Sequence, residues 1–78
     1  MSNMPETGTK VYVIVVGDTG MPYIIIDNVK AIHTRIITNH NYATTYELAS
    51  TGFYMPFNRV FLSEDAAQNM LKRLWKGE

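Results

Sequence analysis

The chain has 78 residues, enough for one domain, and 46% of them are hydrophobic, an ordinary fraction for a folded domain. Its seven basic and seven acidic residues balance, which disfavours nucleic acid as a partner because phosphate contacts require a basic excess. Cysteine is absent, which excludes disulfides, thiolate metal sites and cysteine nucleophiles, and no apolar run approaches the ~18 residues of a membrane span. We therefore expect one soluble, cytoplasmic domain without a membrane segment.

The first expected element follows a polar N-terminal segment. Residues 1–9 predict a flexible tail, so the α+β domain is expected to occupy residues 10–78. The segment Lys10–Val16 contains an uninterrupted β-branched and aromatic run, which predicts a strand covered on both faces. Residues 17–20 then supply glycines and turn residues, which predict a hairpin connection to the next strand.

Further strands are expected in the middle of the chain. Residues 23–26 predict a strand that stops at Asp27. Residues 29–38 are rich in β-branched side chains, which favours a strand, although their apolar spacing also fits a helix. After a turn at residues 39–41, the alternation through residues 42–48 predicts another strand.

The C-terminal part predicts an edge strand followed by a helix. Residues 53–62 are apolar but contain Pro56, so a short edge strand at residues 59–62 is expected. Ser63 is expected to cap a helix over residues 64–76, because its hydroxyl can accept from an unpaired backbone N–H. The whole pattern predicts a small antiparallel sheet of four to five strands, flat or curled, with one C-terminal helix packed on one face.

The chain carries no recognisable motif for catalysis or for a cofactor. The histidines, His33 and His40, have a spacing that matches no standard metal motif. Residues 17–20 join strand to strand and lack the helix and lysine of a phosphate-binding loop. Asp18 and Asp27 are interpreted as turn residues. We therefore expect no catalytic residue, no metal and no cofactor, and hence a protein that is not an enzyme.

The aromatic side chains are the main candidates for contact with a partner. Core packing explains most of the five tyrosines, three phenylalanines and one tryptophan. Tyr54 and Phe57 are expected to be exposed because Pro56 interrupts the strand between them, and with Arg59 they form the predicted partner-binding site. Exposed tyrosines can also stack on bases, which leaves open a small β-barrel-like nucleic-acid-binding protein.

Self-association is predicted from the apolar character of the first two strands. Each is apolar on both faces, and a helix over residues 64–76 spans roughly 20 Å and can cover only one of them. The other face requires either a curled sheet or a second molecule. Because the glycines lie at strand ends and not within strands, we favour a homodimer. Its expected interface consists of Tyr12, Ile14, Val16, Ile24 and Ile26.

One segment also resembles a known group of proteins. Residues 58–67 read Asn-Arg-Val-Phe-Leu-Ser-Glu-Asp-Ala-Ala, and the N-terminal strand begins Lys-Val-Tyr-Val. This resembles small, largely uncharacterised phage and prophage accessory proteins, in which a Val-Phe strand end, a Ser or Thr cap, Glu-Glu-Ala and a short helix close the chain. The sequence departs from that pattern at Asp65, where glutamate is usual. The resemblance covers the two ends of the chain and implies no catalytic residues.

The resemblance implies a role class, namely compact accessory proteins that bind host machinery, including defence systems. With the absence of catalytic motifs, it leads to a hypothesis: a non-enzymatic binding protein of phage or mobile-element origin that modulates or inhibits a host protein by surface contact. The expected location is the host cytoplasm. The nucleic-acid-binding protein is the first alternative, and a minor structural component of the virion is the second.

Overall fold

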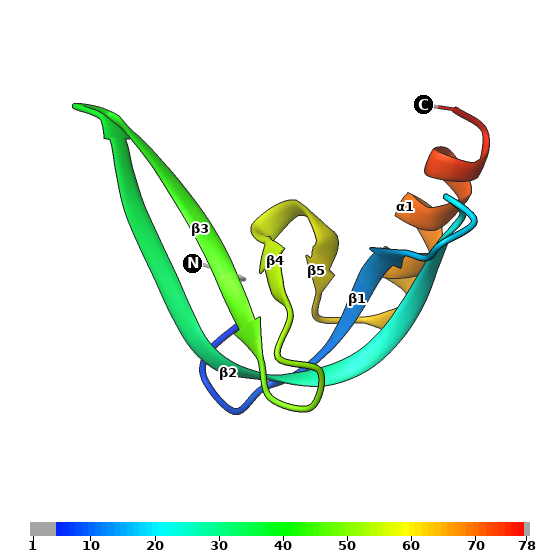
Figure 1. The fold of residues 1–78 in the computed structure, drawn as a ribbon, viewed down its shortest axis with the longest axis horizontal. Helices are drawn as coiled ribbons and strands as arrows, with labels where there is room; N and C mark the ends of the chain where they lie inside the picture. Colours follow the sequence, from blue (N-terminus) through cyan, green and yellow to red (C-terminus); the bar gives the residue numbers. More distant parts are fainter. Residues whose placement is uncertain (1–4, 78) are drawn as a thin grey trace.

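The computed structural model describes residues 5–77, and in these it shows a five-stranded sheet and one C-terminal α-helix (Figure 1). The strands pair antiparallel in the order β4-β3-β2-β1-β5. The predicted fold class, an antiparallel sheet with one C-terminal helix, is confirmed. In chain order the elements are β1 (Lys10–Val16), β2 (Pro22–Thr38), β3 (Asn41–Leu48), β4 (Tyr54–Pro56), the 3-10 turn η1 (Phe57–Arg59), β5 (Val60–Phe61) and α1 (Glu64–Trp75).

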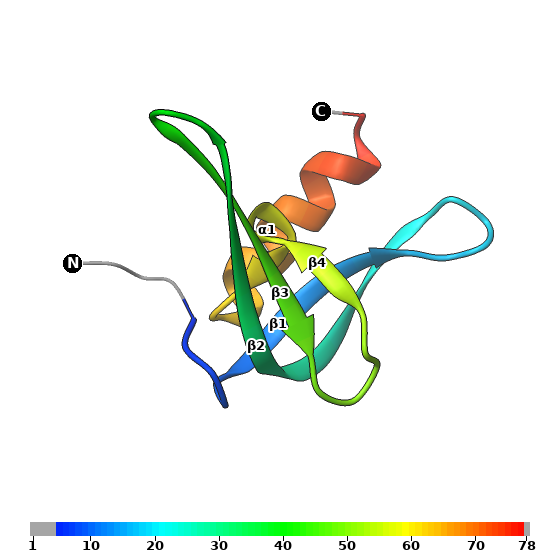
Figure 2. The same cartoon turned by 60° about the vertical axis from the view of Figure 1, so that its left-hand side comes forward.

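Strand β2 is 17 residues long, and its bend shapes the sheet. Residues 22–28 pair with β1, whereas the residues from Val29 onward pair with β3. The register shifts between Val29 and Ala31, and such an irregularity bends a strand and increases its twist. Figures 1 and 2 show β2 sweeping from the β1 half of the sheet to the β3 half. The strand predicted for residues 29–38 is confirmed, but the expected stop at Asp27 is wrong because the strand continues through it.

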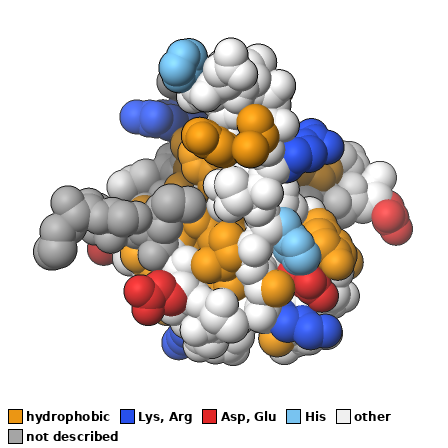
Figure 3. All heavy atoms as spheres, turned by 90° about the vertical axis from the view of Figure 1, so that its left-hand side faces the viewer, with side chains coloured by type: hydrophobic (Ala, Val, Ile, Leu, Met, Phe, Trp, Pro, Cys, Tyr) orange, Lys and Arg blue, Asp and Glu red, His pale blue; other side chains and the backbone are white. Residues whose placement is uncertain are grey.

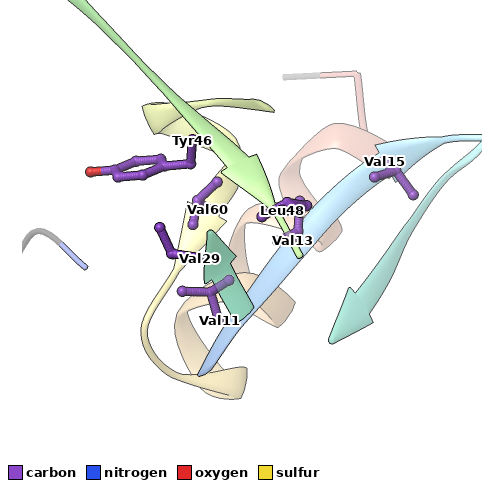
Figure 4. Close-up of a cluster of buried hydrophobic side chains, with 7 residues drawn as sticks. All are labelled: Val11, Val13, Val15, Val29, Tyr46, Leu48 and Val60. Atoms are coloured by element: carbon purple, nitrogen blue, oxygen red, sulfur yellow. The ribbon is translucent and has the colours of Figure 1, made fainter. Parts of the chain in front are cut away.

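The bend folds the two halves of the sheet around one buried cluster (Figure 4). Alternation along β1 places its three cluster members on the same face of the strand. Every member is at most 7% exposed, so the curled sheet covers this face without a second molecule. The cluster consists of Val11, Val13 and Val15 of β1, Val29 of β2, Tyr46 and Leu48 of β3, and Val60 of β5.

Helix α1 covers the opposite face of the β1–β2 pair. It packs against β1, β2 and β5, and its buried residues are Ala67 and Leu71. Ile14 lies on this face of β1 and is 1% exposed. Near the end of the helix, Trp75 Nε1 donates to the Pro22 carbonyl oxygen at 3.0 Å. Both faces of β1 are therefore covered within a single chain.

The ends of α1 follow the expected capping chemistry. Ser63 Oγ accepts from the Ala66 N–H at 3.2 Å, which confirms the predicted N-cap. Glu64 and Asp65 occupy the first turn, where the helix dipole favours negative charge. Gly77 takes a φ of 84° beyond the helix, a conformation that favours glycine.

The residues expected to mediate self-association lie in different environments. Ile14 is buried, Tyr12 and Ile24 are half-buried, and Val16 and Ile26 are exposed. The dimer was expected because one face of the sheet had to be covered, but the curled sheet covers that face itself. Curling did not require a glycine inside a strand, since the register shift in β2 supplies the bend.

The folded domain begins earlier in the chain than expected. Residues 1–4 of the predicted tail lie outside the described residues. Pro5 is buried, the Gly8 N–H donates to the Val29 carbonyl oxygen at 2.7 Å, and the Val29 N–H donates to the Thr9 carbonyl oxygen at 3.0 Å. Residues 5–9 therefore belong to the folded domain, although the boundary was expected at residue 10.

Candidate functional site

A projecting hairpin is the most distinctive surface feature, and Figures 1 and 2 show it standing away from the body. We call residues 33–44, from β2 and β3 with their connecting turn, the arm. Within residues 5–77, β1 pairs with β2 only as far as Asn28, and β4 pairs with β3 only from Thr45 to Glu47. The arm thus has no third strand. Its side chains include three exposed large hydrophobics: Ile36, Ile37 and Tyr42.

A charged cluster lies where the arm joins the body, on the face that points away from the core. Glu47 contacts both basic members of the cluster. His33 Nε2 is 3.0 Å from Glu47 Oε1, and Lys30 Nζ is 3.5 Å from Glu47 Oε2. Ring centroids of His33 and Tyr54 are 5.4 Å apart. From the side of the arm, Figure 3 shows acidic, basic and histidine side chains close to hydrophobic ones.

The electrostatics of the cluster keep Glu47 ionised. The hydrogen bond with His33 is the largest influence and lowers the pKa of the Glu47 carboxyl. Desolvation opposes this shift, whereas the Lys30 ammonium and the Tyr54 hydroxyl reinforce it. The net direction is downward, so Glu47 remains a carboxylate that neutralises the Lys30 ammonium and accepts the hydrogen bond from His33.

A shallow hollow of about 360 Å³ lies beside the cluster. Its walls come from β2, β3 and β4: His33, Thr34, Arg35, Ala43, Thr45 and Tyr54. Among the described residues Arg35 forms no salt bridge, whereas Lys30 is compensated by Glu47. The hollow therefore combines an uncompensated guanidinium, hydroxyl groups and an aromatic wall, which suits a ligand with an anionic group.

The same residues supply little of what a hydrolytic site needs. A histidine oriented by a carboxylate is one part of such a site, and a nucleophile and oxyanion donors are the others. The His33 side chain is 50% exposed, and in the described part of the chain its ring hydrogen-bonds only to Glu47. No three His, Asp or Glu side chains within residues 5–77 are placed to share a metal ion.

The three predicted partner-binding residues are neighbours in the chain but differ in exposure. Tyr54 is 60% exposed and Phe57 is 58% exposed, which confirms the exposure expected from Pro56. Arg59 is half-buried in η1, and its guanidinium donates to the Asn58 carbonyl oxygen at 3.4 Å. Tyr54 lines the hollow, whereas Phe57 and Arg59 do not.

Sequence reasoning missed most of the residues that line the hollow. His33 was interpreted as a strand residue, and Arg35 and Thr45 were not considered as site residues. A signal was present, because residues 28–46 contain Lys30 and Arg35 but no acid. Only the pairing of β2 with β3 places Arg35 next to Ala43 and brings these residues to one face.

Asp27 is a buried acid with a structural role. Its Oδ1 accepts the backbone N–H groups of Asn28 at 2.7 Å and Ser50 at 2.9 Å, and its Oδ2 accepts the N–H and the hydroxyl of Thr51, both at 3.1 Å. Burial raises the pKa of Asp27, but the hydrogen bonds outweigh burial and the net pKa is lowered. The carboxylate thus joins the middle of β2 to the turn after β3.

Comparison with family models, with curated proteins and with solved structures gives no match. Neither helical segment in the described residues has the length and apolar character to cross a membrane. The arm and the hollow are therefore the features of the molecule from which a function can be inferred.

Proposed function

We propose that this protein is a non-catalytic binding protein that acts by surface contact with a partner protein. The observation that supports this most strongly is the arm, which has no third strand among residues 5–77 and exposes Ile36, Ile37 and Tyr42. An isolated two-stranded hairpin is marginally stable in water, and burying a large apolar side chain contributes about 1.5–3 kcal/mol. A partner that covers the arm and the nearby Tyr54 would therefore stabilise the hairpin and bury its exposed apolar side chains.

The partner we propose is a host protein. Support comes from the resemblance of residues 58–67 to phage and prophage accessory proteins, whose role is to bind and modulate host machinery, including defence systems. The absence of cysteine fits a reducing compartment such as the host cytoplasm. Occupying a functional surface of the host protein would inhibit or redirect that protein.

The nucleic-acid alternative has one supporting observation, which is the exposure of Tyr42 and Tyr54. Stacking platforms normally operate together with cations that track the phosphate backbone. Here Glu47 contacts both Lys30 and His33, and within the described residues Arg35 is the cation lining the hollow that has no acidic partner. The local charge therefore supports a protein partner more than a polyanion.

Affinity capture with matched variants tests the proposed function. Tagged wild-type protein, the double variant Tyr54→Ala/Phe57→Ala and the control Met21→Ala are incubated with lysate of a bacterial host. Met21 is 55% exposed and lies in the β1–β2 turn, which projects away from the arm (Figure 2). Circular dichroism confirms that all three proteins are folded.

We expect one specific protein to be enriched by the wild type and by Met21→Ala, and to be reduced roughly tenfold or more by the double variant. The proposal fails if no protein is enriched, or if the double variant captures as much as the control. Retention of single-stranded oligonucleotide in place of protein would favour the nucleic-acid alternative. Recovery of the protein in purified phage particles would favour a structural role in the virion.

A further inference from the structure

The outer edge of β3 is open over its first four residues. The β3–β4 register runs from the Glu47–Tyr54 pair to the Thr45–Pro56 pair, and then the chain turns away into η1. Residues 41–44 pair with β2 on their inner side and have no strand partner on their outer side among the described residues. An open edge of this kind is a template for another strand.

The open edge presents backbone groups that can form hydrogen bonds. Leu48 donates its N–H toward the β4 side, to the Phe53 carbonyl oxygen at 2.9 Å. Backbone groups alternate in direction along a strand, so Tyr46, Thr44 and Tyr42 direct their N–H and C=O groups to the same side as Leu48. Those of Tyr42 and Thr44 lie beyond the end of β4 and point outward.

This edge also lacks the features that usually block strand addition. Residues 41–44 are Asn, Tyr, Ala and Thr, with no charge and no proline, and their pairs with β2 shift register only at the turn end. The opposite edge of the arm, on β2, carries Arg35 and the extra residue of the register shift between Ile36 and Thr38, and Lys30 lies on the same edge just before the arm. Lysine, proline and bulges are the common protections of an edge strand. The β3 edge is therefore the receptive side of the arm.

The hollow adds a charge preference to this edge. Arg35 is the direct cross-strand neighbour of Ala43, and both line the hollow. A strand added beyond β3 would lie about 4.8 Å from it, and its residue opposite Ala43 would point to the same face. Because Ala43 is small, the Arg35 guanidinium can extend over it toward that residue. No acid within residues 28–46 competes for this guanidinium.

We propose that the occupant of this edge is an extended, acidic segment of the partner protein. It adds as a strand along Asn41–Thr44 through the backbone groups of Tyr42 and Thr44. A glutamate or aspartate opposite Ala43 places its carboxylate in the hollow against Arg35. This inference rests on the proposed function and specifies the partner segment that the arm recognises.

Peptide titration monitored by nuclear magnetic resonance tests this inference directly. The probe is an acetylated and amidated pentapeptide, Thr-Val-Glu-Val-Thr, and the control peptide has glutamine in place of glutamate. With the glutamate peptide we expect shift changes at the amides of Tyr42, Ala43 and Thr44 and slower hydrogen exchange at Tyr42 and Thr44. The glutamine peptide should bind more weakly at the same amides.

Two pairs of variants separate the backbone contribution from the charge contribution. Thr44→Pro removes an outward N–H and should weaken the glutamate peptide roughly tenfold, whereas Thr44→Val keeps the N–H and should bind normally. Arg35→Gln should weaken the glutamate peptide roughly threefold to fivefold and leave the glutamine peptide unchanged, whereas Arg35→Lys should retain most of the preference. If Thr44→Pro does not fold, the exchange data and the Arg35 variants still decide the question.

Several results would overturn the inference. Shift changes confined to other strands, or equal binding of both peptides, would exclude an acidic strand on this edge. Concentration-dependent protection of Tyr42 and Thr44 without peptide would identify a second copy of the chain as the occupant. If the lysate partner is captured equally by Thr44→Pro, Arg35→Gln and wild type but lost with Tyr54→Ala/Phe57→Ala, the edge proposal fails while the proposed function stands.

Discussion

The substitution Asp27→Asn tests the most specific structural contact in the fold. The side chain is 2% exposed, and its two oxygens accept four hydrogen bonds from Asn28, Ser50 and Thr51. Asparagine keeps one acceptor oxygen and presents an NH₂ donor where the other oxygen accepted two bonds. Losing two charge-assisted hydrogen bonds at about 1.5 kcal/mol each lowers the free energy of unfolding by about 3 kcal/mol. That is a large share of the roughly 5 kcal/mol expected for a small domain.

Urea denaturation followed by circular dichroism measures this difference. In thermal denaturation of the same proteins, the melting temperature should fall by roughly 12–24 °C, since 1 kcal/mol corresponds to about 4–8 °C in a domain of this size. Asp18→Asn is the matched control, because Asp18 is exposed in the β1–β2 turn, and it should change stability by less than about 0.5 kcal/mol. An Asp27→Asn protein as stable as the control would refute the reasoning.

The pH dependence gives an independent test of the same carboxylate. The folded-state pKa of Asp27 is lowered relative to its unfolded value of about 3.9. The carboxylate therefore contributes its full stabilisation above about pH 4, and this contribution is lost as the pH falls through the folded-state pKa. The stability difference between wild type and Asp27→Asn should be constant from pH 5 to 7 and shrink below about pH 4. A difference that grows on acidification would contradict the assignment.

Three further predictions follow from the helix and the curled sheet. Ser63→Ala should lower the free energy of unfolding by about 1 kcal/mol in urea titration, whereas Ser63→Asp should retain the cap. Leu71→Ala should cost about 2–4 kcal/mol in the same assay, and Leu62→Ala, at a 45% exposed position, less than about 1 kcal/mol. Light scattering should give a concentration-independent mass near 8.9 kDa, because one chain covers both faces of β1. A mass twice as large would support the homodimer instead.

The sequence was informative where local chemistry determines structure. The β-branched run of Lys10–Val16 predicted β1, and Ser63 with the acids after it predicted the start of α1. These elements depend on side-chain rotamers, alternation and capping within a few residues. The exposure of Tyr54 and Phe57 was likewise predictable, because Pro56 limits the strand locally.

The sequence was less informative where distant segments determine structure. Asp27 resembled a turn residue, but it lies inside a continuous strand, and besides the adjacent Asn28 its hydrogen-bond donors are Ser50 and Thr51, more than 20 residues away. The bend of β2 depends on pairing with β1 on one side and β3 on the other. For the same reason the curled sheet remained the alternative, and a homodimer was favoured to cover the apolar face.

The candidate site was harder to predict than the fold. Arg35, Ala43 and Tyr54 lie on three different strands and meet only because of the register between them. β4 was also missed, because Pro56 was interpreted as a strand breaker, whereas it ends a three-residue edge strand. Because strand register brings the lining residues together, the sequence signals the hollow only through its charge pattern, here the stretch of residues 28–46 that contains no acid.

The central claim is that the arm and the adjacent β4 form the contact surface for a protein partner. Hydrogen exchange of the captured complex, compared with the free protein, tests this claim most directly. We predict slower exchange in residues 41–44 and 54–57 and unchanged exchange in the β1–β2 turn at residues 17–21. Protection confined to α1 or to the β1–β2 turn, with residues 41–44 and 54–57 unaffected, would contradict the claim.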